Sequence, residues 1–597
     1  MKKYISLFVS INLTIALLVG CTQTPVQTQT PTEQPSDEQN QNEAMFVPGT
    51  YEGMARGMNG DVNVSVSFTK NAIETITVGV HSETEGVCNN AMNIIPDAVI
   101  ANQSLAVDAV SGSTISSAAL LGAIRDCVNQ AGGDSAVDTL KNRKIDSVPS
   151  AEEALEADII VIGGGGAGLS AAITAAEQGK SVVLLEKLGF LGGSTLLSGG
   201  GLLFCTDEND DGVPLTVDKL VDYSNLRTEG HHDEKLVRAV GEMSIEVMDW
   251  LEDMGVKWTD VSTEIVGETM RIKTGDYNGV MYLGGGAGVI QPMEKKAREL
   301  GVKIFLNTSG TELITNDSGT VVGIKAEKKD GGIVSCKGNA VILATGGYAR
   351  NKEMVQRFAP LLNDVLPIVN WSTIGNTGDG IRMAEAIGAG IVAEGETANG
   401  NQASDLRTPY IAELFVNKEG VRIDNEVEHY GRLSGSQFKK ASSAYFKIFD
   451  GKATGDFEGA IADGECYKGD TIEELAAAAG IDKATFASTV KRYNDLCEKG
   501  IDEDYGKPAD FLNGLTQPPF YAVNTPMQIV STYGGIHINA DAEVLDNSGN
   551  VIPGLYAAGE TANGTIFYKE YTSSGLAIQH AVSTGRIAAN TAIEKMK

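Results

Sequence analysis

The stretch of residues 156–187 constrains the fold more than any other part of the sequence. It reads "EADIIVIGGGGAGLSAAITAAEQGKSVVLLEK": an apolar run, a glycine cluster, a helix of small residues and a second apolar run. The second run ends in Glu186, which stands 18 residues after Gly168, the last glycine of a G-x-G-x-x-G motif. In this strand–turn–helix context, the motif is the fingerprint of a dinucleotide-binding βαβ unit. The sequence therefore predicts an α/β fold with a Rossmann-like parallel sheet.

Each residue of the fingerprint has a physical task. Gly163 makes the tight turn, Gly165 lets the backbone approach a pyrophosphate, and Gly168 lets the helix lie close to the sheet. The N-terminus of the helix then faces the phosphates, and Glu186 is expected to accept hydrogen bonds from the adenosine ribose. NAD and FAD share this fingerprint, so it leaves both dinucleotides open.

Three later segments favour FAD: "LGGSTLLSGGG" at 191–201, "AVILATGG" at 340–347 and "GNVIPGLYAAGE" at 549–560. Together with "NTGDGIRMAEAIGA" at 376–389, they resemble the fumarate reductase and ketosteroid dehydrogenase superfamily over residues 155–597. The resemblance implies non-covalent FAD, with the acid of the last segment at the ribityl chain. The residues that it places at FAD are Gly163, Gly165, Gly168, Glu186, Lys187, Gly193, Ser194, Thr195, Gly199, Gly200, Asp379, Glu560, Ser574 and Leu576.

Length and charge limit the alternatives. A chain of 597 residues with 42% hydrophobic residues and 70 glycines is long enough for several globular domains. Its formal net charge of −31 argues against a nucleic acid partner, because phosphate binding needs a basic face. The cysteines after Cys21 form no C-x-x-C motif, so neither zinc, an iron–sulfur cluster nor attached haem is expected. "GHHDEK" at 230–235 resembles a metal-binding pair, but a solvated turn is the favoured interpretation.

The first 45 residues predict export and anchoring. "MKKYISLFVSINLTIALLVGC" has the basic start, apolar run and small-residue ending of a secretory signal over residues 1–20. "LVGC" resembles the bacterial lipoprotein box, which implies lipid on Cys21; an ordinary signal peptide with an incidental cysteine is the alternative. Residues 21–45 contain few apolar side chains and predict a flexible tether. We expect the protein on the extracytoplasmic face of a bacterial cell membrane, with the bilayer as a partner.

Residues 46–145 predict a small α+β domain. Strand-like alternation up to residue 84 is followed by helical spacing at 91–104 and 116–132. The span 46–131 resembles the FMN-binding domain of electron-transfer flavoproteins, in which a threonine carries FMN through a phosphodiester bond. The residues that match its motif are Asp108, Ser111, Gly112, Ser113, Thr114, Ile115 and Ser116. The resemblance implies covalent FMN at Thr114, and an unmodified helix N-cap is the alternative.

The FAD family also has a capping domain inserted in its FAD-binding domain. Its best match here is 390–510, which divides the FAD-binding domain into 155–389 and 511–597. The predicted fold is thus a Rossmann-like FAD-binding domain with an inserted α+β capping domain. A small α+β FMN-binding domain and a lipoprotein signal peptide precede it.

The substrate residues differ from those of fumarate reductases. In that family arginines and histidines hold a dicarboxylate, and an arginine delivers the proton four residues after an R-F-x-N-E strand. Here the strand is "RIDNE" at 422–426, and Tyr430 takes the place of the arginine. Tyr571 takes the place of the arginine that grips the carboxylate, and Val530 that of a histidine. Fumarate is therefore disfavoured as the substrate.

These replacements resemble the 3-ketosteroid dehydrogenase branch. There one tyrosine exchanges a proton, while a second tyrosine and a glycine N–H hold the substrate carbonyl. The resemblance gives these roles to Tyr430, Tyr571 and Gly575. Hydrogen-bond donors suffice for a neutral ketone oxygen, whereas a carboxylate favours arginine. His429 is expected to be solvated or supporting, and Arg432 is the alternative acid.

We therefore expect a two-flavin reductase. Electrons would pass from a membrane donor, such as a quinol or an NADH-dependent flavin chain, through FMN to FAD. A hydride would then reach the C=C bond of an α,β-unsaturated carbonyl compound, either an enone such as a steroid or an aromatic enoate. Three alternatives stay open: a urocanate- or fumarate-type enoate reductase with Arg432 as the acid, a ketosteroid-type dehydrogenase running oxidatively, and a redox-carrier lipoprotein without turnover.

Overall fold

The computed structural model describes most of the chain after the predicted tether. The described residues are 44–57, 60–83, 88–110, 113–143, 145, 149–205, 215–265, 268–275, 285–365, 369–370, 372–402, 412–427, 439–440 and 444–597. The predicted signal peptide, Cys21, His429, Tyr430 and Arg432 lie outside the described residues.

The N-terminal unit, residues 44–143, is a three-stranded antiparallel sheet covered by two helices. Its elements are β1 (Gly49–Arg56), β2 (Asp61–Phe68), β3 (Ile73–Val78), α1 (Asn89–Asn102) and α2 (Thr114–Asn142). Every second residue of β2, from Val62 to Phe68, is buried against the helices, as the period of a strand requires. The strands predicted up to residue 84 are present as β1, β2 and β3. The second helix is longer than expected, because it continues through Gly133, where its backbone breaks from helical geometry (φ 68°, ψ −174°).

The central unit is built on a six-stranded sheet in the order β10-β6-β5-β14-β24-β23. Its strands are β5 (Ile159–Ile162), β6 (Val182–Leu185), β10 (Lys303–Phe305), β14 (Ala340–Leu343), β23 (Glu543–Leu545) and β24 (Val551–Ala557). All pairs are parallel except β23 with β24. Every residue of β5, β6 and β14 is buried, as in a parallel sheet covered on both faces. The predicted Rossmann-like sheet is confirmed.

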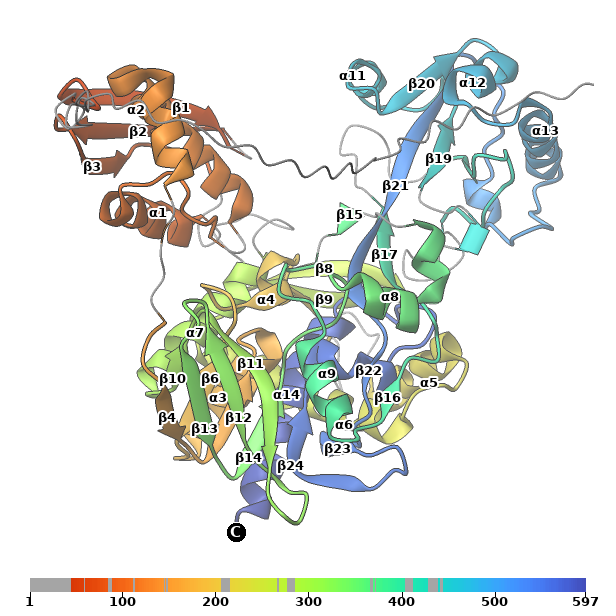
Figure 1. The fold of residues 1–597 in the computed structure, drawn as a ribbon. Helices are drawn as coiled ribbons and strands as arrows, with labels where there is room; N and C mark the ends of the chain where they lie inside the picture. The colour runs from red at the N-terminus through yellow and green to blue at the C-terminus, as the bar shows by residue number, and fades with distance from the viewer. Residues whose placement is uncertain are drawn as a thin grey trace, which may run out of the picture.

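Different layers cover the two faces of this sheet (Figure 1). Alternate strand residues, Ile159 and Val161 among them, pack on helices, while Ile160 and Ile162 pack toward a second sheet. The helices are α3 (Gly166–Glu177), α6 (Glu234–Asp253), α7 (Gly285–Glu299) and α14 (Leu576–Lys595). The second sheet has the order β11-β12-β13-β4, with β11 (Thr308–Thr315), β12 (Val321–Lys328), β13 (Ile333–Lys337) and β4 (Glu153–Glu156).

Shorter elements surround the edge at which the parallel strands end. They are α4 (Gly193–Leu197), α5 (Val217–Thr228), α8 (Lys352–Phe358), α9 (Asp379–Ala386), β7 (Gly201–Leu202), β8 (Trp258–Ile265), β9 (Glu268–Gly275), β16 (Ile391–Val392), β22 (Gly535–Ile536), η1 (Pro360–Val365) and η3 (Gly559–Thr565). The turns after β5, β6, β14 and β24 all meet at this carboxyl edge, where open parallel sheets bind their ligands.

The cap is a second six-stranded sheet with helices on it. It contains β15 (Val369–Asn370), β17 (Ala398–Gln402), β18 (Leu414–Val416), β19 (Ala444–Phe449), β20 (Cys466–Gly469), β21 (Phe520–Thr532), α11 (Phe457–Ala462), α12 (Ile472–Ala479), α13 (Lys483–Lys499) and η2 (Ala509–Phe511). The long strand β21 pairs with β17, β19 and β20. The cap sheet therefore extends beyond residue 510, where we expected the FAD-binding domain to resume. The sequence did not indicate this extension of the cap sheet, because β21 pairs with strands more than 50 residues earlier in the chain.

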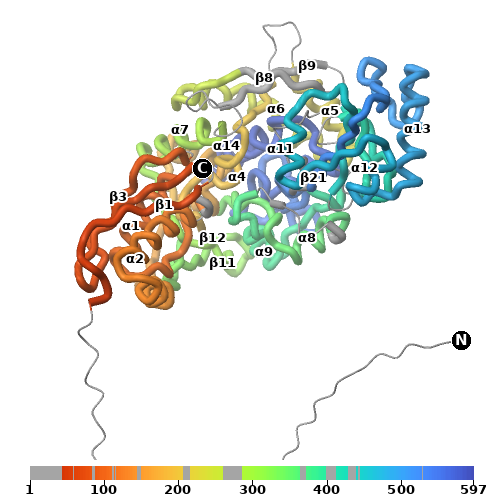
Figure 2. The backbone as a smooth tube through the Cα atoms, turned by 90° about the horizontal axis from the view of Figure 1, so that it is seen from above, coloured from red at the N-terminus to blue at the C-terminus, as the bar shows by residue number. Residues whose placement is uncertain are grey.

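The N-terminal unit and the cap both lie above the central unit in Figure 1, the first at the left and the second at the right, and Figure 2 shows them well apart. The hairpin between β12 and β13 contacts the N-terminal side: Lys329 forms an ion pair with Asp108 at 2.9 Å. Ser150, in the connection between the two units, donates a hydrogen bond to Asp330 at 3.3 Å. In the described part of the chain, no helix combines the length and the apolar character needed to cross a membrane.

Candidate active site and cofactor sites

The first glycine loop connects β5 to α3 at the carboxyl edge. Gly163 has a φ of 101°, a left-handed value that glycine adopts without steric cost. A Cβ on Gly168 would lie 1.8 Å from the carbonyl oxygen of Gly163, so the helix can approach the turn only with glycine at this position. A Cβ on Gly165 would meet nothing nearer than the Gly192 oxygen at 3.8 Å. The backbone of Gly165 thus borders room for a ligand at the N-terminus of α3.

The second glycine loop lies beside the first. Gly165 and Gly192 form a parallel bridge, and the Gly192 N–H donates to the Gly164 oxygen at 2.7 Å. Gly193, Ser194 and Thr195 open the short helix α4. Beyond Gly199, Gly200 has a φ of 68°, and a Cβ there would lie 2.1 Å from the Gly285 backbone. The two loops form one glycine-lined cradle across the ends of β5 and β6.

Glu186 follows β6 and is fixed by the backbone around it. Its Oε2 accepts the Gly164 N–H and its Oε1 accepts the Leu188 N–H, both at 2.7 Å. Burial raises the pKa of this carboxyl, while the two N–H groups oppose that rise. Each oxygen has a second lone pair, so the carboxyl can still accept a ribose hydroxyl.

A chain of polar side chains joins the second glycine loop to η3. Ser194 accepts a hydrogen bond from Asn376 at 3.3 Å, and Asn376 donates to Glu560 at 2.9 Å. Glu560 also accepts the Thr532 N–H at 2.8 Å. A Cβ on Gly347 would lie 2.3 Å from Glu560 Oε1, which explains the glycine at this position after β14. The roles of Asn376 and Thr532 were not predicted, because their partners lie far away in the sequence.

Lys187 and Asp379 form a second connection. The Lys187 ammonium lies 2.6 Å from Asp379 and 2.5 Å from the Thr377 hydroxyl. Burial raises the pKa of Asp379, but the hydrogen bond and charge of Lys187 outweigh it, and the net shift is downward. This ion pair ties the end of β6 to the start of α9.

These residues fit FAD. Glycines leave space for a pyrophosphate at the N-terminus of α3, and Glu186 can accept from the adenosine ribose. Glu560, Asn376 and Ser194 provide polar groups further along the same edge. At the N-terminus of α14, Gly575 has a φ of 83° and precedes Leu576, with Ser574 one residue earlier.

The predicted FMN attachment motif lies at the start of α2. Thr114 is the first residue of the helix; its side chain, with Ser111 and Gly112, lies outside the described part. Ser113 is buried, and Ser116 donates a hydrogen bond to the buried Glu83. Ser117 accepts the Val110 N–H at 3.0 Å. Glu83, 33 residues earlier, is thus a neighbour of the motif.

Tyr571 lies at the N-terminus of α14. Its hydroxyl accepts the Ala577 N–H at 3.0 Å, and the side chain is 5% exposed. Burial raises the pKa of Tyr571 to about 12, although the N–H groups of Ala577 and Gly575 lower it. The structure therefore brings Tyr571 and Gly575 together and keeps the phenol protonated at neutral pH.

An aromatic row continues from Tyr571. The Phe567 ring lies 5.5 Å from Tyr571 and 5.7 Å from Tyr533, which follows Thr532 in the glycine turn after β21. Neither Tyr533 nor Phe567 was predicted from the sequence to be a site residue. The two histidines of "GHHDEK" have separate partners: His231 stacks on Tyr568 at 4.1 Å, and His232 bonds the Thr228 hydroxyl at 2.6 Å.

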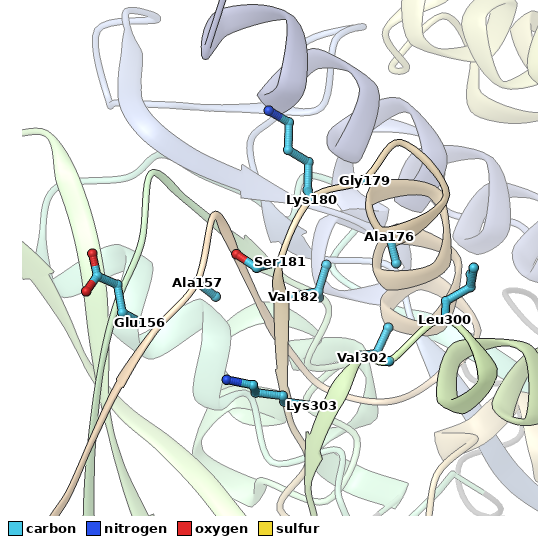
Figure 3. A pocket seen from close by; sticks show the side chains of 11 residues that line it. Glu156, Ala157, Ala176, Gly179, Lys180, Ser181, Val182, Leu300, Val302 and Lys303 are labelled. Atoms are coloured by element: carbon cyan, nitrogen blue, oxygen red, sulfur yellow. The ribbon is translucent and has the colours of Figure 1, made fainter.

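A pocket of about 300 Å³ lies at the opposite edge of the central sheet (Figure 3). Ala157, Ser181 and Val302 line it, each just before a strand of the sheet, together with Lys180 and Lys303. It is therefore separate from the carboxyl edge and from the cofactor residues. Within the described residues, no group of three metal-binding side chains is present, and none of the six cysteines after Cys21 forms a disulfide.

Comparisons with known proteins agree with this geometry. The model of the FAD binding domain family matches residues 158–576, and that of the FMN-binding domain matches residues 57–129. The chain is 34% identical over 544 residues to urocanate reductase of Eggerthella lenta, covering 86% of this chain and 87% of that protein.

Two solved structures share the fold. A flavocytochrome c3 fumarate reductase in an open conformation is 30% identical, with a TM-score of 0.59, over 76% of this chain and 83% of that one. A 3-ketosteroid-Δ4-(5α)-dehydrogenase from Rhodococcus jostii RHA1 is 26% identical, with a TM-score of 0.63, over 74% of this chain and 99% of that one. The chain therefore belongs to the FAD binding domain family, with an FMN-binding domain before it, and is a flavin-dependent oxidoreductase that uses FAD and FMN.

Proposed function

We propose that the protein reduces the C=C bond of a small α,β-unsaturated carbonyl compound, an enone or an aromatic enoate. The observation that carries this proposal is the Tyr571 hydroxyl at the N-terminus of α14, 3.0 Å from the Ala577 nitrogen. A phenol that accepts a backbone N–H can donate its own hydrogen to a carbonyl oxygen. In the fumarate reductases that the sequence resembles, an arginine takes this position.

The chemistry needs a hydride, a proton and a polarised carbonyl. FAD, when bound, supplies the hydride to the β-carbon. Tyr571 stabilises the negative charge that develops on the carbonyl oxygen, in a site shielded from water. Tyr430 then protonates the α-carbon, which completes the conversion of C=C to CH–CH.

We also propose a route by which electrons reach FAD. Thr114 would hold FMN, which would supply one relay for electrons on their way from a membrane donor to FAD. A lipid on Cys21 and the tether that follows it hold the protein at the extracytoplasmic face of the membrane. Thr114→Ala tests the attachment: flavin that survives denaturation should disappear, and its persistence would refute attachment at Thr114.

A second candidate is a urocanate-type enoate reductase with Arg432 as the acid. The 34% identity with urocanate reductase over 86% of the chain favours it. Urocanate and the aromatic enoates of the first candidate are both carboxylates, which favour a cationic partner beside the Tyr571 hydroxyl, whereas an enone needs only that hydroxyl.

Flavin reoxidation tests both candidates. The holoprotein is reduced chemically without oxygen and mixed with fumarate, urocanate, cinnamates or enones while flavin absorbance is followed. Rapid reoxidation by enones or cinnamates supports the first candidate, and selective reoxidation by urocanate supports the second. Reoxidation by none of these compounds would instead favour a redox carrier or an enzyme that runs oxidatively.

A further inference from the structure

The chain around Tyr571 has no regular secondary structure. We call residues 565–575, which join η3 to α14, the Tyr571 segment. From residue 566 on they form neither a helix nor a strand, although Phe567 and Tyr571 are buried. The backbone bonds of a helix or a sheet therefore do not fix Tyr571, and its location depends on contacts with other parts of the chain.

One neighbour runs alongside the Tyr571 segment in the opposite direction. It consists of residues 227–233, the end of α5 and the turn to α6, which we call the α5–α6 turn. It contains the two histidines of "GHHDEK". The pairs, in order, are Arg227 with Glu570 (ion pair, 3.7 Å), Glu229 with Lys569 (ion pair, 3.3 Å), His231 with Tyr568 (stacked rings, 4.1 Å) and Asp233 with Thr565 (N–H to oxygen, 2.9 Å).

The pair nearest to Tyr571 is the more buried of the two ion pairs. The side chains of Arg227 and Glu570 are 8% and 26% exposed, whereas Glu229 and Lys569 are mostly in contact with water. Salt and water screen a partly buried pair less than an exposed one. Because Glu570 directly precedes Tyr571 in the chain, the contact with Arg227 restricts where the Tyr571 backbone can lie.

The α5–α6 turn is itself held in place. The Thr228 hydroxyl donates to the Ser224 oxygen at 2.7 Å, so its own oxygen can accept from His232 Nδ1 at 2.6 Å. Asp233 caps α6 by accepting the Lys235 N–H at 2.9 Å. A turn that is bonded at both ends can support a neighbouring segment that lacks such bonds of its own.

The backbone of the turn carries a further sign of selection for its side chains. Glu229 has a φ of 54°, in the left-handed region that glycine adopts without steric cost, and Gly230 follows with a φ of 79°. A glycine in place of Glu229 would relieve this strain but would remove the partner of Lys569. Strained residues persist where the surrounding structure fixes them, and they cluster at functional sites.

The stacked histidine also contacts the start of the cap. His231 Nδ1 lies 2.8 Å from Glu394, and a Cβ on Gly395 would lie 1.9 Å from the Tyr568 carbonyl oxygen. Glu394 and Gly395 stand between β16 and the cap strand β17. Tyr568 is therefore held between the α5–α6 turn and the connection to the cap.

We infer that the α5–α6 turn positions Tyr571 to hold the substrate carbonyl, an inference that rests on the proposed function. The Ala577 N–H orients the Tyr571 hydroxyl from the side of α14 at 3.0 Å. The turn supports the backbone that leads to the same residue. A misplacement of about 1 Å can cost about 100-fold in rate, so a hydroxyl that donates to a carbonyl oxygen needs both supports.

Arg227 and His231 are positioning residues in this arrangement. Arg227 acts through Glu570, and His231 acts through Tyr568. The first histidine of "GHHDEK" thus supports the Tyr571 segment, while the second, His232, supports the turn.

Arg227→Met tests the inference, because it removes the charge and keeps a long side chain. The FAD-loaded, chemically reduced protein is mixed with the compound that reoxidises the wild type fastest. The limiting rate should fall about 10- to 100-fold. In a Tyr571→Phe background the same change should lower the rate less than about twofold, because the hydroxyl that it would displace is already absent. Equal losses in the two backgrounds would show that Arg227 acts independently of Tyr571, and would overturn the inference.

Amide hydrogen exchange gives a measurement that does not depend on turnover. The Tyr571 hydroxyl accepts the Ala577 N–H, so its displacement should expose that N–H to water. Exchange over residues 572–578 should therefore quicken in Arg227→Met, as it should in Tyr571→Phe. Wild-type exchange in Arg227→Met, with faster exchange in Tyr571→Phe, would contradict the inference.

Arg238→Met is the matched control. Arg238 also joins α6 to α5, at 2.7 Å to Asp218, but Asp218 lies at the opposite end of α5 from Arg227. Rate and exchange should keep the values of the parent protein in both backgrounds. A change equal to that of Arg227→Met would show that any arginine between these helices matters, and the inference would fail.

His231→Ala keeps the inference testable if Arg227→Met does not fold. It removes the stack on Tyr568 and the pair with Glu394 from an exposed side chain. The rate should fall about threefold or more, and again only where Tyr571 keeps its hydroxyl. Wild-type rates in His231→Ala, and in Arg227→Met where it folds, would overturn the inference. Failure of every compound to reoxidise the wild type, or a wild-type rate in Tyr571→Phe, would instead refute the proposed function.

Discussion

The cofactor edge of the central unit and the cap fix the positions of their groups in different ways. At the cofactor edge, glycines remove side chains so that backbone can approach backbone, as at Gly168 and Gly163. In the cap, opposite charges are brought together from Arg422 and Asp502, which are 80 residues apart. The first device is local and visible in the sequence. The second exists only once the chain has folded, so it cannot be recognised from neighbouring residues.

Tyr430→Phe, in the predicted capping segment, should cause the largest loss of turnover. Removing the hydroxyl that we propose as the proton donor should lower turnover by about 10²- to 10⁴-fold. FAD should stay bound, because the cofactor residues lie on the central unit. Stopped-flow reoxidation and bound-flavin absorbance check both statements. Near-normal turnover, combined with a large loss in Arg432→Lys, would move the acid to Arg432.

At the cofactor edge, Gly168→Ala and Gly165→Ala distinguish a glycine that backbone packing requires from a glycine that FAD binding requires. The new Cβ of Gly168→Ala collides with the Gly163 oxygen at 1.8 Å, so the free energy of unfolding should fall by about 3 kcal/mol. Gly165 has a φ of −76° and room for a Cβ. Gly165→Ala should therefore leave the stability of the apoprotein unchanged, or raise it by up to about 1 kcal/mol, but weaken FAD binding. Urea unfolding and FAD titration measure the two effects, and equal stability losses would contradict the distinction.

Glu413→Gln probes the electrostatics of the cap beside the buried Lys507, whose ammonium donates to the Glu413 backbone oxygen at 2.8 Å. Burial raises the pKa of Glu413 to about 7, against an ordinary value of 4.5. The folded protein thus binds a proton that the unfolded chain releases between these values, so stability should fall as pH rises from about 4.5 to about 7. Glu413→Gln should flatten this fall and be more stable than the wild type above pH 7. Urea unfolding at several pH values checks it, with exposed Glu473→Gln as the control that keeps the wild-type slope.

Lys329→Ala should give the smallest effect, at the contact between the N-terminal and central units. The Lys329–Asp108 pair is exposed, so it contributes about 0–1 kcal/mol and is screened by salt. Small-angle scattering should show a slightly more extended molecule, and added salt should extend the wild type toward the same value. Lys325→Ala removes an ion pair to Glu312 on neighbouring strands and should leave the dimensions unchanged.

The features that could be predicted from the sequence are those that depend on residues close together in the chain. The glycine turns, Glu186, the parallel sheet and the helix after the FMN motif follow from local patterns, and the structure has them. The bond between Ser194 and Asn376, and the place of β21 in the cap sheet, depend on residues far apart in the chain. No local pattern marks Arg422 and Lys507 as buried, because charged side chains are normally expected at the surface. Tyr430 remains a prediction from resemblance alone.

The strand β21 has a consequence for how the protein unfolds. Its 13 residues span about 43 Å as one extended rod. The cap strands β19 and β20 pair with its first half, β17 pairs with its second half, and its last residue, Thr532, donates its N–H to Glu560 at the cofactor edge. The cap cannot lose its sheet without releasing part of the FAD site. Calorimetry should therefore record the cap and the central unit as a single cooperative transition, with the N-terminal unit melting as a separate one.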